Sequence, residues 1–417
     1  MYRIARLRDK KSKDLNGVRC IKGAEDKVLV KDEDIKQRWS DYFDKLFNGD
    51  QAHTSDTTVL REEGNYDFMR RIREFEVKEA LKKMKMGKAA GPDGIPIEVW
   101  KTLGDMEIRW LTKLFNKIWR HGKMPDAWRK STIVPIYKNK GDIQNCSNYR
   151  GIKLISHTMK LWERVIEHRL RQKVTISENQ FGFMPGRSTI EAIHLLRQLM
   201  ERYRAGKKDL HVIFIDLEKA YDKVPREILW WVLTKKLVPV KYINIIKDMY
   251  EGAITNVKTN DGLSSSFPIT IGLHQGSALS PLLFAIVMDE LTRHIQTEVP
   301  WCMLFADDIV LVDETRSGLN DKLELWRSTL ESRGFRLSRS KTEYMECSFS
   351  GRSGINPIEI NLGGEKVSKT NHFRYLGSVL QNNDRLEKDI NHRIQAGWMK
   401  WRSASGILCD QNMPLRL

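Results

Sequence analysis

The chain lacks the features that mark disulfide-stabilised, secreted and membrane-spanning proteins. Its five cysteines are scattered over 417 residues, with no Cys-x-x-Cys pair and no Cys/His cluster, so a disulfide scaffold and a zinc knuckle are both unsupported. No apolar run reaches the roughly 18 residues that span a bilayer. The basic N-terminus has neither the apolar core nor the cleavage site of a secretory signal. We therefore expect an intracellular protein, nuclear or cytoplasmic, that is not secreted and has no membrane partner.

Acidic residues are also in deficit. The chain has 71 Lys and Arg against 54 Asp and Glu, which gives a formal net charge of +17. A globular chain with this excess of positive charge is typical of proteins that bind a polyanion, most often nucleic acid. The length is enough for two or three domains.

Three of the aspartates lie where carboxylates are energetically costly. Asp216 ends the apolar run Val-Ile-Phe-Ile, and Asp307 and Asp308 separate two apolar runs that predict a β-hairpin. Burying these groups costs several kcal/mol unless a cation compensates, and neither strand contains Lys or Arg. Mg²⁺ is the natural partner of hard carboxylate oxygens. A pair of such ions would stabilise the attacking and leaving oxygens of a phosphoryl transfer.

Other aspartates have simpler explanations. Asp222 and Asp313 are interpreted as turn or helix-capping residues. Of the aromatic residues, Trp119, Trp162 and Trp230 recur at helical spacing with other apolar residues, which favours core packing over base stacking.

Hydrophobic periodicity predicts alternating helices and strands along the chain. We expect a linker at 51–66. Helices are expected at 32–48, 76–86, 97–121, 157–173, 188–205, 225–236, 277–296 and 319–333. Strands are expected at 132–137, 210–216 and near 335–349, with a hairpin at 301–314.

Nine short segments in a fixed order carry a specific resemblance. They are GPDGIP (91–96), PIYKNKGD (135–142), NYRGIKLIS (148–156), QFGFMPGRST (180–189), IFIDLEKAYDKV (213–224), GLHQGSALSP (272–281), FADD (305–308), GFRLSRSKT (334–342) and FRYLG (373–377). With these segments the sequence resembles the reverse transcriptases of non-LTR (LINE-type) retrotransposons over about residues 87–380.

The resemblance implies an α+β fold of the right-hand polymerase class, in which an antiparallel palm sheet packs on helices. The expected division is a basic N-terminal extension with one amphipathic helix and a linker (1–66), fingers (67–205), palm (206–380) and the start of a thumb (381–417). Relatives carry an endonuclease domain that we do not find here, and we expect the thumb to be incomplete.

The implied activity is RNA-directed DNA synthesis from a primer 3′-hydroxyl. The expected partners are an RNA template, a DNA primer and dNTPs, and the expected cofactors are two Mg²⁺ ions, with Mn²⁺ as a substitute. An inactive polymerase-like remnant that binds RNA is the alternative, although all three aspartates are retained. A metal-dependent nuclease lacks support, because no His- or Glu-rich site accompanies these segments. The sequence does not indicate an oligomeric state.

The resemblance also assigns the catalytic groups. Asp216, Asp307 and Asp308 match the family's metal-binding residues. Lys341 matches the lysine proposed to protonate the leaving pyrophosphate, although an exposed surface lysine explains it equally well.

Five residues match positions that hold the incoming nucleotide. The backbone carbonyl of Leu217 would complete one metal's shell. The ring of Tyr221 would exclude a 2′-hydroxyl, or else it is a core tyrosine. Gln275 would lie near the nucleotide's 3′-hydroxyl, or else it belongs to a helix-capping loop. Lys138 and Arg150 would grip the triphosphate, or else they are solvated loop cations.

Four further residues match positions near the primer or the template. Phe305 and Ala306 would support the nascent base pair and the primer end. Arg187 would contact a backbone phosphate. Tyr375 belongs to a hairpin that grips the primer in the family, and a core role explains it equally well.

Overall fold

The computed structural model describes residues 20–49, 69–351 and 359–409, which divide into two compact units. In the described part of the chain, unit 1 comprises residues 177–218, 291–351 and 359–409, and unit 2 comprises 20–49, 69–176 and 219–290. Both units combine helices with sheets, so the predicted α+β class is confirmed. The predicted linker at 51–66 lies outside the described residues. Among the described helices, none has both the length and the apolar character that crossing a bilayer requires.

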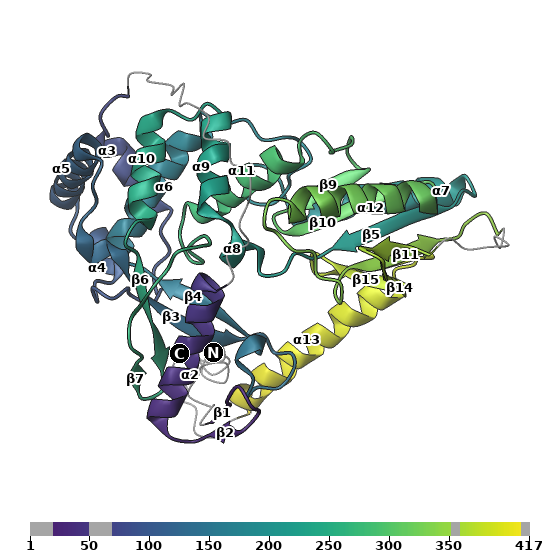
Figure 1. The fold of residues 1–417 in the computed structure, drawn as a ribbon, viewed down its shortest axis with the longest axis horizontal. Helices are drawn as coiled ribbons and strands as arrows, with labels where there is room; N and C mark the ends of the chain where they lie inside the picture. The colour runs from purple at the N-terminus through teal and green to yellow at the C-terminus, as the bar shows by residue number, and fades with distance from the viewer. Residues whose placement is uncertain (1–19, 50–68, 352–358, 410–417) are drawn as a thin grey trace. The chain divides into compact units, whose positions relative to one another are not determined.

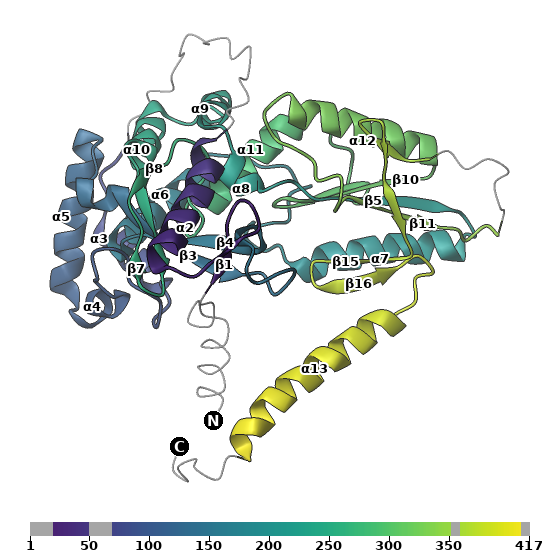
Figure 2. The same ribbon diagram turned by 60° about the horizontal axis from the view of Figure 1, so that its bottom comes forward.

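Unit 1 is built on a five-stranded sheet in the order β14-β11-β5-β10-β9. Strand β5 (Leu210–Ile215) is central and pairs antiparallel with both of its neighbours. Because alternate residues of a strand face opposite sides, Val212 and Phe214 pack with α7 (Thr189–Ala205) in one apolar cluster. Helix α12 (Arg316–Glu331) contacts β5 and β10, and Figure 2 shows it on the other side of the sheet.

The other elements of unit 1 complete the sheet and lead to a long C-terminal helix. They are β9 (Cys302–Phe305), β10 (Asp308–Asp313), β11 (Glu343–Cys347), β12 (Asn361–Leu362), β13 (Glu365–Lys366), β14 (Ser368–Thr370), β15 (His372–Tyr375), β16 (Ser378–Gln381) and α13 (Glu387–Leu408).

Unit 2 contains a sheet in the order β4-β3-β6-β7, with β8 also paired to β6. Helices α3, α5, α6 and α10 gather at one end of this unit (Figure 1). Phe115 of α5 and Trp162 of α6 lie in the core there, with ring centroids 5.3 Å apart. The predicted core role of Trp119 and Trp162 is confirmed, because they are 3% and 0% exposed.

The elements of unit 2 are β1 (Ile21–Lys22), β2 (Val28–Leu29), α2 (Asp32–Asn48), α3 (Glu74–Lys82), α4 (Ile97–Thr102), α5 (Asp105–His121), β3 (Lys130–Tyr137), β4 (Tyr149–Leu154), α6 (His157–Arg171), α8 (Ala220–Lys223), α9 (Arg226–Lys235), α10 (Val240–Tyr250), β6 (Ile254–Thr259), β7 (Gly262–Leu263), β8 (Phe267–Pro268) and α11 (Ser280–Thr292). Short 3₁₀ turns occur at Asp126–Arg129 and Cys146–Asn148.

Most predicted elements are present, and the differences have local causes. The helix expected at 97–121 is two helices, because Gly104 adopts φ +87° between α4 and α5. This backbone conformation is readily available only to glycine. Helix α10 and strands β4 and β6 were not predicted.

Candidate active site

Strand β5 carries Asp216 from the core of unit 1 to an edge of its sheet. Every residue of β5 is buried, whereas the Asp216 side chain, which follows directly, is 37% exposed. The next residue, Leu217, forms a β-bridge with Leu337 and is itself buried. Asp216 is therefore partly solvated, which lowers the cost of its charge.

The predicted hairpin at 301–314 is confirmed, but its turn is displaced by one residue. Asp308 pairs with Phe305 as the first residue of β10, so the loop consists of Ala306 and Asp307. Ala306 has φ +59°, the left-handed conformation that two-residue hairpin loops require at their first central position. The two aspartates thus differ in setting, since one is in the loop and the other is in the strand.

The register of the sheet brings the three aspartates to the same end of unit 1. Ile215 pairs with Ile309 across the antiparallel ladder. The ladder ends at this pair, and Asp216 and Asp308 are the next residues of the two chain segments at that end. Asp307 adjoins this pair in the loop.

The backbone brings the three aspartates to one end of the sheet, but their side chains do not come together as one set of metal ligands. The described residues contain no group of three or more His, Cys, Asp or Glu side chains placed to hold one metal ion. The donor chemistry nevertheless fits Mg²⁺ or Mn²⁺, because the register collects three carboxylates at adjacent strand ends.

Lys341 occupies the position next to Asp216. Its Nζ lies 3.0 Å from Asp216 Oδ1, and the two side chains are 62% and 37% exposed. The segment that carries Lys341 is held against β5, because the amide of Ser338 donates to the Asp216 carbonyl at 2.8 Å. An ion pair with this exposure contributes little to stability, but it places an ammonium group beside a candidate metal ligand.

Gln180 holds the hairpin turn from a distant part of the sequence. Its Oε1 accepts hydrogen bonds from the backbone N–H of Ala306 at 3.1 Å and of Gly182 at 2.9 Å. The side chain is 1% exposed. A Cβ on Gly182 would lie 2.3 Å from the Ala306 nitrogen, so glycine permits this close approach. No role was predicted for Gln180.

In unit 2, the short helix α8, which carries Tyr221, is joined to the loop that carries Gln275. The ring of Tyr221 is half-buried and stacks on Phe284 with centroids 4.2 Å apart. Its carbonyl accepts from the amide of Leu273 at 2.7 Å. Gln275 Nε2 donates to Asp222 Oδ2 at 2.9 Å. Helix α8 and the Gln275 loop are therefore held in a fixed relation within this unit.

Asp222 and Lys153 form a buried pair of charges beneath Gln275. Both are at most 8% exposed, so the interpretation of Asp222 as an ordinary turn or capping residue is incomplete. Burial raises the pKa of Asp222 and the Lys153 charge opposes that rise, whereas burial lowers the pKa of Lys153 and Asp222 opposes that fall. Within the described residues, Lys153 Nζ has no hydrogen-bond partner and lies 4.4 Å from the centroid of the Phe47 ring.

The Lys153 backbone adds a second link to the same loop. Its amide donates to the Gln275 carbonyl at 2.9 Å. Gly276, which has φ +110°, approaches so closely that a Cβ there would lie 2.6 Å from the Lys153 carbonyl oxygen. Strand β4 therefore supports the Gln275 loop through the main chain, and the Lys153 charge acts on Asp222, the partner of the Gln275 side chain.

Lys138 and Arg150 lie on the β3–β4 hairpin of unit 2. Arg150 pairs across the ladder with Ile136 and is exposed, as is Lys138. Lys138 Nζ donates to the Ser147 carbonyl at 2.8 Å. Lys138 also contributes a positive charge that lowers the pKa of Asp222.

In unit 1, the residues expected near primer and template differ in how deeply they are buried and in what they contact. Phe305 is half-buried at the hairpin, and Arg187 is paired with Glu191 and lies 4.8 Å from the Phe181 ring centroid. Tyr375 is 2% exposed, with its ring centroid 5.7 Å from that of Phe214. Burial raises the pKa of Tyr375 first, and the Asp308 charge raises it further. A direct primer contact by Tyr375 does not follow from this buried position.

The expected site residues are divided between the two units. Tyr221, Gln275, Lys138 and Arg150 belong to unit 2, and all the others belong to unit 1. Gln180 and Lys153, which had no predicted role, and Asp222, which was interpreted only as a turn or capping residue, all lie inside segments that carry the family resemblance. Membership of such a segment was therefore the available signal.

Comparison with known proteins identifies the family of this chain. Residues 136–380, more than half of the chain, match the family described as reverse transcriptase (RNA-dependent DNA polymerase). A Pol polyprotein from the type-1 retrotransposable element R2 of Nasonia vitripennis is 26% identical over 77% of this chain and 33% of its own length. A probable RNA-directed DNA polymerase from transposon BS of Drosophila melanogaster is 28% identical over 74% of this chain and 36% of its own length. These relatives confirm the resemblance to retrotransposon proteins.

The mobile element jockey of Drosophila melanogaster encodes a third relative, an RNA-directed DNA polymerase that is 26% identical over 81% of this chain and 38% of its own length. The chain thus spans little more than a third of the length of the relatives it matches. Among solved structures, apo telomerase from Candida tropicalis aligns with a TM-score of 0.42 and 14% identity, over 69% of this chain and 59% of the telomerase chain.

Proposed function

Because the chain belongs to the reverse transcriptase (RNA-dependent DNA polymerase) family, we propose that it synthesises DNA on an RNA template. The primer 3′-oxygen attacks the α-phosphorus of a dNTP, a new phosphodiester bond forms, and pyrophosphate leaves. The observation that carries this proposal is the register of unit 1, in which Ile215 pairs with Ile309 and Asp216 and Asp308 directly adjoin that pair. The inferred site of action is inside the cell.

Asp216, Asp307 and Asp308 are the proposed metal ligands. Bound Mg²⁺ ions, or Mn²⁺ in their place, would neutralise the triphosphate and lower the pKa of the primer hydroxyl. The protein's own contribution is to fix the carboxylates on the β5 edge and the β9–β10 turn. Gln180 supports this role by accepting from the Ala306 amide. The Leu217 carbonyl adds an oxygen next to Asp216.

Lys341 is the proposed proton donor to the leaving pyrophosphate. Its ammonium lies 3.0 Å from Asp216 Oδ1, where it competes with any cation that Asp216 binds. If Asp216 bound a metal ion instead, the 62% exposed Lys341 side chain would no longer be held by Asp216 and could reach the triphosphate. The contact places Lys341 beside a proposed metal ligand. Because both side chains are partly exposed, the same contact adds little to the stability of the fold.

The nucleotide contacts are proposed for unit 2. Tyr221 excludes a 2′-hydroxyl with a ring that is braced by Phe284. Gln275 contacts the sugar, and its side chain is oriented by Asp222. Lys138 and Arg150 bind the triphosphate, since both are exposed on the β3–β4 hairpin. Phe305 and Ala306 support the primer end, and Arg187 contacts a backbone phosphate.

Primer extension on a defined RNA template, with dNTPs and Mg²⁺ or Mn²⁺, tests this function. The unaltered chain is expected to extend the primer, and Asp307→Asn is expected to reduce the rate at least 100-fold. The matched control is Asp321→Asn on α12, which changes an exposed carboxylate of the same unit and should leave extension intact.

The same assay has an outcome that contradicts the proposal. If the unaltered chain retains the primed RNA on a gel but extends it no further than Asp307→Asn does, the chain is an RNA-binding protein without polymerase activity. A nuclease would instead shorten the template or the primer under the same conditions.

A further inference from the structure

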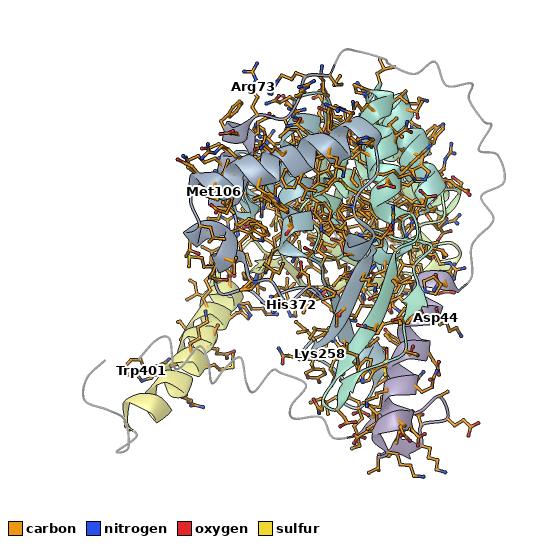
Figure 3. All side chains as sticks on the ribbon, turned by 90° about the vertical axis from the view of Figure 1, so that its left-hand side faces the viewer. Asp44, Arg73, Met106, Lys258, His372 and Trp401 are labelled. Atoms are coloured by element: carbon orange, nitrogen blue, oxygen red, sulfur yellow. The ribbon has the colours of Figure 1, made fainter. Side chains whose placement is uncertain are left out.

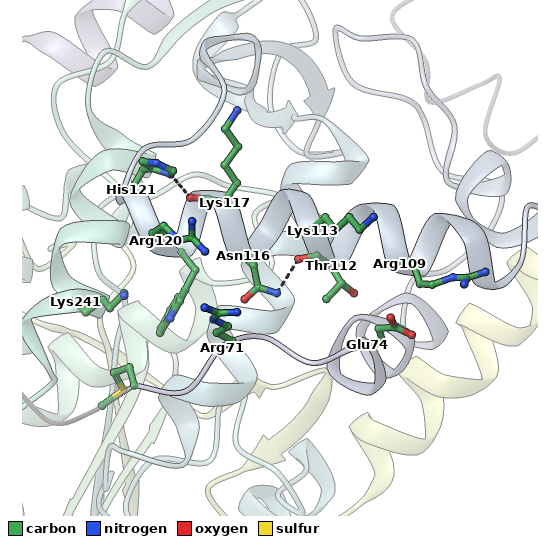
Figure 4. A pocket seen from close by; sticks show the side chains of 12 residues that line it. Arg71, Glu74, Arg109, Thr112, Lys113, Asn116, Lys117, Arg120, His121 and Lys241 are labelled. Carbon is green, nitrogen blue, oxygen red and sulfur yellow. Dashed lines mark hydrogen bonds between the residues drawn. The ribbon is translucent and has the colours of Figure 1, made fainter.

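Unit 2 contains a strongly basic cavity that none of the proposed polymerase residues line. It has a volume of about 700 Å³ and lies among α3, α5, α10 and the segment before α3 (Figure 4). Its cationic lining residues are Arg71, Arg109, Lys113, Lys117, Arg120 and Lys241. Glu74 is the one carboxylate in the lining. We call this feature the α5 cavity.

Among the described residues, the cations of the α5 cavity form no ion pair. In the described ranges, no carboxylate lies within ion-pair distance of the five arginine and lysine side chains that come from α5 and the segment before α3. Elsewhere in unit 2, Arg129 pairs with Asp248 and Lys236 with Asp289. Clustered like charges repel one another, so an anionic ligand would be bound at a site already arranged for it.

The spacing of these cations favours a polyanion over a single small anion. Arg109, Lys113 and Lys117 follow one another at intervals of four residues, so they share one side of α5 and recur about every 6 Å along its axis. Arg120 extends the row by one more turn. A lone phosphate would contact only part of this row, whereas a strand with one phosphate per nucleotide can engage all of it.

An aromatic pair adjoins the row, in which Trp110 is exposed and Trp100 is half-buried. Trp110 is 53% exposed, stacks on Trp100 with centroids 5.8 Å apart and planes 15° apart, and lies one turn before Lys113. Met106, one turn earlier, is 72% exposed and is labelled near one end of α5 in Figure 3. Aromatic faces beside a cationic groove are the combination that binds unpaired bases.

We propose that the α5 cavity and the adjoining Trp110 face form a second nucleic-acid site, which takes a single-stranded polynucleotide. The cations bind successive phosphates and Trp110 stacks with a base. This site is distinct in its residues from the proposed catalytic and nucleotide-binding groups. RNA and single-stranded DNA share the chemistry that this surface recognises, so the test compares both.

The test is binding of an unprimed, fluorescently labelled 20-nucleotide RNA or DNA to the full chain over a range of salt concentrations. The variant is K113Q/K117Q/R120Q, and the control is K82Q/K83Q/K85Q, which removes the same charge from exposed positions of unit 2 outside the cavity. We expect the variant to lose roughly tenfold or more in affinity, and its plot of log affinity against log salt to be shallower by about two. The control should bind like the unaltered chain.

Trp110→Ala separates stacking from charge. It should weaken binding several-fold with an unchanged salt slope, because it removes base contact and no charge. Extension of a pre-annealed primer–template at saturating concentration should be unaffected in all of these variants. That result distinguishes a failure of this site from a failure of the proposed polymerase activity.

Three results would overturn the proposal. One is equal binding by the cavity variant and its control. Another is competition by polyglutamate as effective as that by RNA, combined with no effect of Trp110→Ala, which would mark a nonspecific anionic contact or an acidic protein partner. The third uses the unaltered chain and does not depend on a variant's folding: crosslinking of a 4-thiouridine RNA that reaches no peptide within residues 100–121.

Discussion

Ala306 holds an uncommon backbone conformation at the tip of the β9–β10 hairpin, and the amide group of Gln180 is positioned to maintain it. Replacing Gln180 by Met keeps the size of the side chain but removes the oxygen that accepts from the amides of Gly182 and Ala306. Two buried N–H groups would then lack a partner, which costs about 1–3 kcal/mol each. We expect Gln180→Met to lower the urea midpoint and to reduce the extension rate more than primer–template affinity.

Gln198→Met is the matched control for that substitution. Gln198 is exposed on α7 of the same unit, so its loss should change neither the midpoint nor the rate. An unaltered extension rate in Gln180→Met would mean that the hairpin turn needs no support from Gln180.

The ring of Tyr221 is the proposed barrier to a ribonucleotide's 2′-hydroxyl. Because Phe284 stacks against it at 4.2 Å, the ring cannot easily withdraw from a 2′-hydroxyl. Tyr221→Val is expected to reduce the preference for dNTPs over NTPs by at least tenfold, whereas Tyr221→Phe, which keeps the ring, should retain the preference. Single-nucleotide incorporation with each substrate measures the ratio. Equal ratios in the valine and tyrosine proteins would remove Tyr221 from sugar selection.

Single residues differ in how well the sequence predicts them. Asp216, Asp307 and Asp308 were identifiable because carboxylates interrupt apolar strands, which is a local signal. Gln180 was not, because its partner Ala306 lies 126 residues away. Lys153 was missed for the same reason, and so was the burial of Asp222, because two buried charges lie near each other only when distant segments meet in three dimensions.

Helices α3 and α6 are joined by a buried ion pair that gives unit 2 a defined dependence on pH. Glu76 and Arg169 are about 3% and 5% exposed, with Arg169 Nε 2.7 Å from Glu76 Oε1. Burial alone would raise the pKa of Glu76, but hydrogen bonds from Arg169, the Arg73 amide and Arg70 lower it to about 2. The pair's contribution is therefore complete above pH 4.5 and is lost as the pH falls toward 2.

Glu76→Gln tests the ion pair that joins α3 and α6. It leaves the Arg169 charge buried without a counter-charge, so we expect it to cost about 3 kcal/mol at neutral pH. Urea unfolding at several pH values between 7 and 3 should show the difference from the unaltered chain shrinking below about pH 4.5. A difference that stays constant over this range would show that Glu76 has the same pKa in the folded and unfolded chains, which contradicts a pKa lowered by the ion pair. Glu79→Gln, an exposed neighbour on α3, is the control.

Elements with a strong local pattern were predictable, and those defined by their partners were not. The helix at 32–48 and the hairpin at 301–314 have clear periodicity, and both are present. Strand β4 lies in a polar-looking segment and becomes a strand by pairing with β3, and β6 pairs in parallel with β3 more than 120 residues away. Helix α10 lacks a side-chain cap, so one of the usual start signals is missing.

At the scale of the whole molecule, the family membership confirms the predicted fold class, an α+β right-hand polymerase. Order and spacing of the nine segments were sufficient for that inference, although no single segment was. The excess of Lys and Arg indicated a polyanionic partner, but it did not indicate where on the protein such a partner would bind. The α5 cavity illustrates this difference, because its cations come from the segment before α3, from α5 and from α10, and only the fold gathers them.

The net charge of +17 leads to a prediction for the whole chain. Each phosphate contact releases bound counterions, which contributes about −0.7 to the slope of log affinity against log salt for single strands and about −0.9 for duplexes. If six or more cations contact phosphates, affinity for primed RNA should fall by roughly 10³-fold or more between 50 and 200 mM salt. Fluorescence anisotropy of labelled primer–template over this range measures the slope. Asp307→Asn is the control and should keep the same salt slope, because that residue contacts no phosphate directly. An affinity of the unaltered chain that does not change with salt would exclude binding dominated by phosphate contacts.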